Sequence, residues 1–253
     1  MVGLADMLAP DEIGPGPAIE PEAPPPLPAV GERRAVQAEM AAVLCLAVVP
    51  HLFHAVILYA GVKFTRPGFG FDMLQLTVMS LQVAAPLLYI LWRSGSPLST
   101  FGLLRPRWLD AGSGLLLFFG VWVANTLAWP VAWSLFGDSL LAGPAENLRV
   151  GRPQSAEDYL VFVIAMAANA FAEELAMRGY LVTRLRQLGA SPWATIVISA
   201  GLFGAYHIYQ GLWAGILVTL CGVVFAAAFL WLGRLWPVVL AHLLLDFLAF
   251  LYV

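Results

Sequence analysis

The sequence is short of charge. Asp, Glu, Lys and Arg make up 11% of its 253 residues, and apolar residues make up 60%. Soluble domains carry about 25% charged and roughly 45–50% apolar residues. A chain this apolar, with a mean hydropathy of +0.81, cannot cover a water-facing surface. The composition therefore predicts a protein whose main solvent is the lipid bilayer.

Cysteine and basic clusters are scarce as well. The two cysteines, Cys45 and Cys221, both lie in apolar runs, and we expect reduced packing residues rather than a disulfide. No run of Lys and Arg forms the basic patch that nucleic acid requires, so a nucleic-acid partner is not expected. The N-terminus has no basic start followed by an apolar run, so we expect no cleavable signal peptide.

Residues 1–35 differ in composition from the rest of the chain. Eight of the 18 prolines fall between Pro10 and Pro28, and residues 1–32 hold six acidic residues but no Lys or Arg. Such a segment cannot bury enough apolar surface to offset its ordering entropy. We predict a disordered, Pro-rich acidic tail over 1–35, followed by a membrane domain over 36–253.

The remainder divides into apolar stretches that each approach the roughly 20 residues needed to span a bilayer. They predict an all-α bundle of about seven (six to eight) transmembrane helices. The stretches are 38–62, 71–92, 112–136, 159–182, 192–208, 211–233 and 236–253.

The loop charges predict an orientation for this bundle. With the N-terminus in the cytoplasm, eight Lys and Arg residues lie in cytoplasmic loops and four lie outside. The positive-inside rule therefore favours a cytoplasmic N-terminus. From this pattern and the Ala-, Pro- and Gly-rich composition we expect an integral protein of the bacterial inner membrane.

Ionisable residues interrupt the fourth apolar stretch. A charge at the centre of a bilayer costs from about 2.5 to well over 10 kcal/mol, so its presence indicates function. Glu174 and Arg178 are four residues apart and share a helix face, where they can pair. The adjacent Glu173 points about 100° away, and neighbouring carboxylates resist double ionisation, which favours one as a proton acceptor. The alternative is a solvated helix end at the interface.

Histidines occupy three other stretches. His242 and Asp246 are four residues apart in an otherwise apolar helix, and a carboxylate there can fix the imidazole tautomer. His207 lies at the end of the fifth stretch, where a lone histidine is usually a packed or interfacial residue. His51 and His54, three residues apart in the first stretch, are interpreted as packing or polar-contact residues.

Together these residues resemble one family. Glu173-Glu174-x-x-x-Arg178, Phe203-x-x-x-His207 and His242-x-x-x-Asp246 follow in that order over residues 158–250. The pattern is similar to the CPBP family, the CAAX proteases and bacteriocin-processing or self-immunity proteins, also called the Abi family. Arg178-Gly179-Tyr180-Leu181 looks like the family's usual continuation, and Phe101-Gly102-Leu103-Leu104-Arg105 resembles a turn before a family helix. The third motif usually ends in asparagine, whereas this chain has Asp246.

The resemblance implies an intramembrane endopeptidase with six catalytic positions. In that scheme Glu173 and His207 activate a water, while His242, assisted by Asp246, stabilises the tetrahedral intermediate or protonates the leaving amine. Glu174 and Arg178 set the local charge and geometry. An ionised aspartate cannot donate to an oxyanion, so orienting His242 is the easier role for Asp246.

The cofactor and substrate stay open at this stage. No His-Glu-x-x-His helix is present, and no Ser or Cys is placed as a nucleophile, which favours glutamate-activated water. A zinc-dependent version would draw its ligands from Glu173, His207, His242 and Asp246. The expected partners are the bilayer and a membrane-associated peptide or protein, with lipidated, leader or C-terminal segments all suitable. The competing interpretations are a proton-coupled transporter and a non-catalytic scaffold or immunity protein.

Overall fold

The computed structural model describes residues 30–60, 68–141 and 152–252, and every regular element in these ranges is a helix. Each predicted apolar stretch coincides with one helix or a run of consecutive helices. The elements are α1 (Val30–Ala47), α2 (Val49–Tyr59), α3 (Phe69–Arg93), η2 (Leu98–Phe101), α4 (Trp108–Leu141), α5 (Ala156–Glu174), η4 (Leu175–Val182), α6 (Thr183–Gln187), α7 (Pro192–Ala205), η5 (Ile208–Gln210), α8 (Leu212–Leu232) and α9 (Trp236–Tyr252).

Five segments are long and apolar enough to cross a membrane. They are Gly31–Tyr59, Phe69–Arg93, Trp108–Val131, Ala156–Gln187 and Leu212–Leu232, and two apolar helices, Pro192–Ala205 and Trp236–Phe250, are shorter. The outer surface keeps large apolar side chains, as at Leu116, which is 78% exposed, and Trp231, which is 86% exposed. Such a surface suits contact with lipid rather than water. The prediction of an all-α polytopic membrane protein is confirmed.

The N-terminal boundary differs from the expected one. Helix α1 begins at Val30, so the last residues of the predicted 1–35 tail are helical. Residues 1–29 lie outside the described part of the chain, and disorder there stays a prediction.

Two helices that carry or lead directly to site residues begin at side-chain caps. Ser155 accepts a hydrogen bond from the Asp158 amide at 3.2 Å, and the Asp158 carboxylate accepts one from the Ser155 amide at 3.3 Å. This reciprocal capping box satisfies backbone donors that the first turn of α5 leaves unpaired. Ser191 caps α7 in a similar way by accepting from the Ala194 amide, and Pro192 occupies the first turn.

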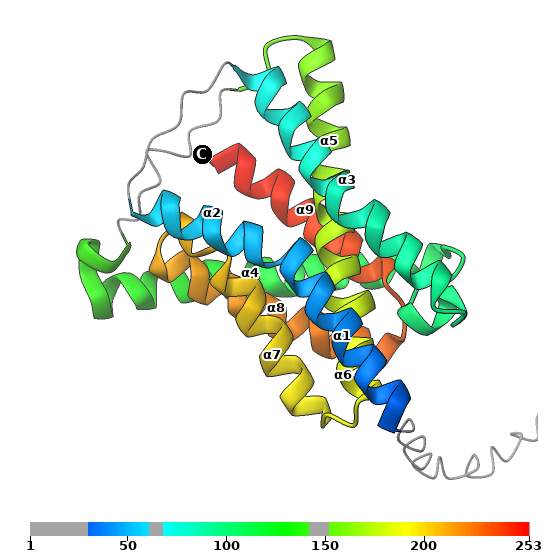
Figure 1. The fold of residues 1–253 in the computed structure, drawn as a ribbon. Helices are drawn as coiled ribbons and strands as arrows, with labels where there is room; N and C mark the ends of the chain where they lie inside the picture. The colour runs from blue at the N-terminus through cyan, green and yellow to red at the C-terminus, as the bar shows by residue number, and fades with distance from the viewer. Residues whose placement is uncertain (1–29, 61–67, 142–151, 253) are drawn as a thin grey trace, which may run out of the picture.

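The helices pack as pairs around a shared core. Helix α3 lies along α5, α4 along α9 and α7 along α8, and α5 crosses α9 near the middle of the molecule (Figure 1). Tyr180, Phe225 and Val238 come from η4, α8 and α9 and are at most 1% exposed. The core therefore lies where the C-terminal half of the chain folds back on itself.

A glycine sets the spacing between α7 and α8. A Cβ atom at Gly204 would overlap the Thr219 hydroxyl and lie 2.8 Å from the Gly215 carbonyl oxygen. Only a residue without a side chain lets the two helices approach this closely. This contact fixes the end of α7 from which His207 follows.

Candidate active site

All six residues predicted from the three motifs converge on one place. Glu173 and Glu174 end α5, and Arg178 lies in η4, a π-helical segment that continues the same rod. His207 follows α7, and His242 and Asp246 lie on α9. A π-helical insertion is often found at functional sites because it displaces side chains from the regular α-helical register.

A buried ion pair forms the base of this cluster. The Arg178 guanidinium donates to Glu174 Oε1 at 2.8 Å, as their spacing predicts, and both side chains are fully buried. His242 Nδ1 lies 2.8 Å from the same Glu174 oxygen. The rings of Phe203 and Phe225 face the guanidinium at 4.2 and 5.5 Å. Glu174 is therefore held by two cationic or donor partners, and it acts as a fixed anchor rather than a group open to substrate.

Glu173 points about 100° away from Glu174, and both histidines face it. Its Oε2 lies 3.9 Å from His207 Nε2 and 3.7 Å from His242 Nε2. Among the described side chains, no direct hydrogen bond reaches this oxygen, although it is buried. Separations of this size are too long for direct hydrogen bonds and suit one water shared by the three groups.

The hydrogen bonds of the two rings assign their nitrogens. His207 Nδ1 lies 2.8 Å from the Phe203 carbonyl oxygen, which can only accept, so Nδ1 carries a proton. His207 Nε2 is then the lone-pair nitrogen when the ring is neutral, and it faces Glu173. His242 Nδ1 likewise donates to the Glu174 carboxylate, and His242 Nε2 faces Glu173 and, at 3.4 Å, Asp246 Oδ1.

This arrangement changes which carboxylate is expected to orient His242. The sequence favours Asp246 as the group that orients His242. The closer partner is Glu174, whose oxygen lies 2.8 Å from Nδ1, whereas Asp246 lies 3.4 Å from Nε2. Glu174 therefore fixes the ring, and Asp246 is left beside the nitrogen that faces the open part of the site.

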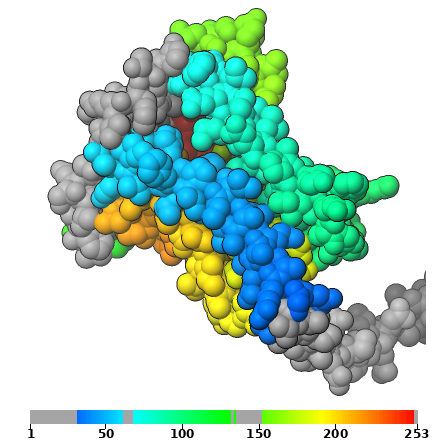
Figure 2. Space-filling view, in the orientation of Figure 1, coloured from blue at the N-terminus to red at the C-terminus, as the bar shows by residue number. Residues whose placement is uncertain are grey.

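A small cavity with both polar and apolar walls adjoins Glu173. It encloses about 20 Å³ and reaches His51 of α2, Ser80 of α3 and Tyr206. A cavity of roughly this volume holds about one water molecule, provided that polar groups line it. Figure 2 shows a hollow on the same side of the molecule, between α2 and α3, with the red end of the chain at its base.

His51 lies closer to this site than the sequence indicates. Its ring packs against Tyr206 with centroids 5.9 Å apart, which agrees with the packing role expected for it. The same ring lines the cavity beside Glu173, so α2 contributes to the walls of the site. Nothing in the local sequence of the first stretch signals this, because the contact joins residues far apart in the chain.

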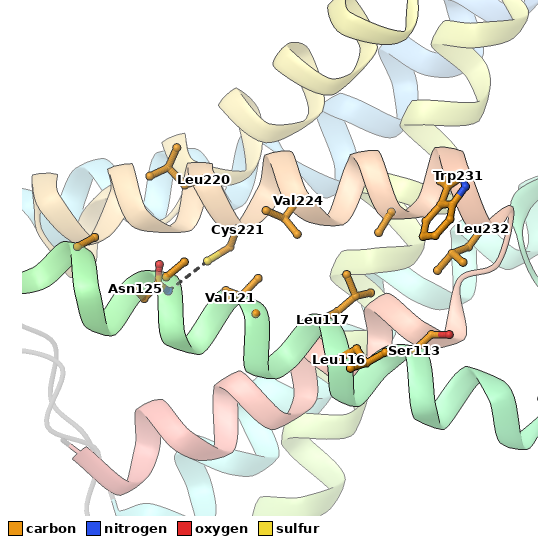
Figure 3. A pocket seen from close by; sticks show the side chains of 14 residues that line it. Ser113, Leu116, Leu117, Val121, Asn125, Leu220, Cys221, Val224, Trp231 and Leu232 are labelled. Atoms are coloured by element: carbon orange, nitrogen blue, oxygen red, sulfur yellow. Dashed lines mark hydrogen bonds between the residues drawn. The ribbon is translucent and has the colours of Figure 1, made fainter.

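A larger cavity lies elsewhere. It encloses about 420 Å³ between α4 and α8 and is lined mostly by apolar side chains (Figure 3). Its polar side chains include Ser113 and Asn125, and the Asn125 amide contacts Cys221 Sγ at 3.4 Å. None of the six predicted site residues lines it. Proton transfer needs ionisable groups, and of the two cavities only the smaller one is lined by a predicted site residue, Glu173, so the candidate active site lies beside it.

The described residues do not assemble a recognisable metal site. Within residues 30–60, 68–141 and 152–252, no group of three or more His, Cys, Asp or Glu side chains is placed to hold an ion. We therefore derive no step through zinc, and the zinc-dependent alternative stays a prediction.

One polar residue that the three motifs do not include also joins the cluster. Asn169 lies one turn before Glu173 on α5, lines the same cavity and contacts Asp246. A polar residue four positions from Glu173 in an apolar helix is a signal that could have identified it.

Residues 155–248 match a family model described as type II CAAX prenyl endopeptidase Rce1-like. The match begins at the cap of α5 and includes every one of the six predicted site residues. It confirms, for this part of the chain, the resemblance that the three motifs indicate. No curated protein and no solved structure gives a significant match.

Proposed function

Because residues 155–248 match the Rce1-like family of type II CAAX prenyl endopeptidases, we propose that this chain cleaves peptide bonds in membrane-associated substrates with a water activated by Glu173. The match supports an intramembrane protease in general. The observation that carries the finer mechanism is the position of Glu173 Oε2, between two histidine nitrogens at 3.7 and 3.9 Å.

The first step would form the bond between water oxygen and the substrate carbonyl carbon. Glu173 accepts the proton that the water loses, and His207 Nε2 is a second acceptor on the same side. Removal of this proton during attack is general base catalysis, which contributes about 10²–10⁴-fold to a rate. The carbonyl oxygen becomes an oxyanion, which needs a donor nearby.

The second step would break the carbon–nitrogen bond. The protonated His242 Nε2 first donates to the oxyanion or to the leaving amine. Glu173 can then give the proton that it took from water to the amine as the amine departs. Glu174 at Nδ1 and Asp246 at Nε2 both favour the protonated ring by accepting from it. His242 is therefore suited to act as the acid, and Glu173 as the base.

Buried protein groups, rather than water, surround the reacting side chains on one side. Arg178 is buried beside Glu174 and balances one carboxylate, so the two adjacent glutamates do not both carry unpaired charge. The surrounding Phe203 and Phe225 rings exclude water from the back of the site. These contacts hold His242 in place, which matters because small misplacements of catalytic groups reduce rates strongly.

The test uses the full chain purified in detergent and reconstituted in liposomes. Wild type is compared with Glu173→Gln, His207→Gln and His242→Gln, and with His54→Gln as a control at an exposed histidine of α2. Substrates are a prenylated C-terminal peptide, the same peptide without its lipid, and a membrane-anchored leader peptide. Mass spectrometry detects the cleaved products.

We expect at least about 100-fold loss in the three site variants and wild-type rates in the control. Equal cleavage by wild type and Glu173→Gln would refute the mechanism. No cleavage of any substrate by wild type would favour a non-catalytic scaffold. A parallel assay with a chelator separates the two protease versions: unchanged activity supports glutamate-activated water, and loss that added zinc restores supports the metal-dependent alternative.

A further inference from the structure

The Asp246 carboxylate has two neighbours, one at each oxygen. Oδ1 lies 3.4 Å from His242 Nε2, and Oδ2 accepts from the Asn169 side-chain amide at 3.4 Å. Only the amide nitrogen of Asn169 can serve here, because the amide oxygen and a carboxylate are both acceptors. The contact therefore also fixes which way the Asn169 amide points.

This bridge joins the two helices that carry the chemistry. Asn169 and Glu173 are four residues apart on α5, so they share one face of that helix. His242 and Asp246 have the same spacing on α9. The Asn169–Asp246 contact lies one helical turn from the point where Glu173 Oε2 and His242 Nε2 face each other at 3.7 Å. It can set the separation of those two atoms.

The carboxylate also needs such a partner. The Asp246 side chain is 23% exposed in an apolar helix, and a carboxylate without donors is costly at that position. With no donor on Oδ2, the group would be free to rotate and present either oxygen to His242. The Asn169 amide on α5 thus faces the Asp246 carboxylate on α9. At the position of Asp246 the third motif usually has an asparagine.

We propose that Asn169 is a positioning residue of the site: its amide holds the Asp246 carboxylate against His242 and ties α9 to α5 one helical turn from Glu173. The inference rests on the proposed protease function. In this proposal a residue outside the three motifs keeps His242, the acid, and Glu173, the base, at the correct separation. A contact that only joins two helices would affect stability without acting on His242.

The experiment is a double-mutant cycle with Asn169→Leu, Asp246→Asn and the double variant, together with the exchange Asn169→Asp/Asp246→Asn. Asn125→Leu is the matched control, because Asn125 is a half-buried asparagine in another span whose amide contacts a different group, Cys221. Cleavage gives kcat and KM. Unfolding in detergent checks that each variant is folded.

A second measurement reads His242 directly. The protein contains four histidines, so ¹⁵N-histidine labelling gives a small set of ring signals that His242→Gln assigns. These signals report the protonation and hydrogen bonding of each ring nitrogen. The measurement needs no substrate and no turnover.

We expect Asn169→Leu to lower kcat by about tenfold with KM within about twofold, and to shift the His242 Nε2 signal. With Asp246→Asn already present, Asn169→Leu should change both readouts much less. The exchange restores one amide and one carboxylate in contact, and we expect it to recover most of the lost kcat. Asn125→Leu should change neither readout.

Two results would overturn the inference. One is independent action, in which the losses of the two single variants multiply in the double variant. The other is a His242 signal that Asn169→Leu leaves unchanged. If wild type cleaves no substrate, the proposed function fails, yet the ring signals still decide whether Asn169 acts on His242 through Asp246.

Discussion

The buried pair of Arg178 and Glu174 gives the sharpest test of how this site is held together. Arg178→Met keeps an unbranched apolar side chain between Phe203 and Phe225 but removes the charge. Glu174 would then keep a carboxylate that is fully buried, with His242 Nδ1 at 2.8 Å as its remaining partner. The perturbation therefore isolates an ion pair rather than a cavity.

The magnitude follows from that geometry. Breaking a buried pair by removing one partner costs about 3–5 kcal/mol. His242 still contacts the carboxylate, which favours the lower end, and we expect a loss of about 3 kcal/mol in unfolding free energy. Replacing both partners, as Glu174→Gln/Arg178→Met, leaves a neutral amide that needs no counter-charge. The double variant should therefore be more stable than Arg178→Met alone.

The assay is unfolding in mixed micelles with increasing denaturing detergent, followed by tryptophan fluorescence from the nine tryptophans. Arg186→Met is the control, because Arg186 is a half-buried arginine nearby whose guanidinium donates to the Ala190 carbonyl oxygen instead of a carboxylate. We expect the control to stay within about 1 kcal/mol of wild type. The reasoning is refuted if Arg178→Met matches that control, or if the double variant is the less stable of the two.

Two further contacts can be tested in the same assay. Glu39→Gln removes the charged acceptor that α1 offers to the Arg184 guanidinium at 2.8 Å. Because this hydrogen bond is charge-assisted, we expect the unfolding free energy to fall by about 1.5–3 kcal/mol. An unchanged unfolding midpoint would contradict this. Gly204→Ala should cost about 1–3 kcal/mol and lower cleavage, since its Cβ would overlap the Thr219 hydroxyl. Gly201→Ala, in the same helix with open space at its Cβ position, is the control, and equal effects at both glycines would show that helix spacing is not the cause.

Local spacing accounts for the parts of the site that could be predicted. Glu174 and Arg178 pair because four residues return to the same face of a helix, and the structure has that pair at 2.8 Å. His242 and Asp246 face each other for the same reason. Long apolar stretches likewise predict the membrane helices, since burial in lipid depends on composition and length more than on partners.

Contacts between helices could not be predicted in this way. The bond from His242 Nδ1 goes to Glu174, 68 residues away, rather than to the nearby Asp246. The position of His51 beside Glu173 and the contact of Asn169 with Asp246 also join different spans. Each depends on helix rotation and relative depth, which side-chain packing decides and which no local periodicity encodes.

Composition and local spacing are enough to predict an all-helical membrane chain and three groups of ionisable residues that are costly to place in lipid. Its motifs also resemble those of one family, and the family model that matches residues 155–248 agrees with that resemblance. The packing of the helices, which no local pattern encodes, places Glu173 between two histidines and buries Glu174 against Arg178. Adjacent residues on a helix point about 100° apart, so the surrounding helices determine which carboxylate is paired with arginine and which faces the histidines.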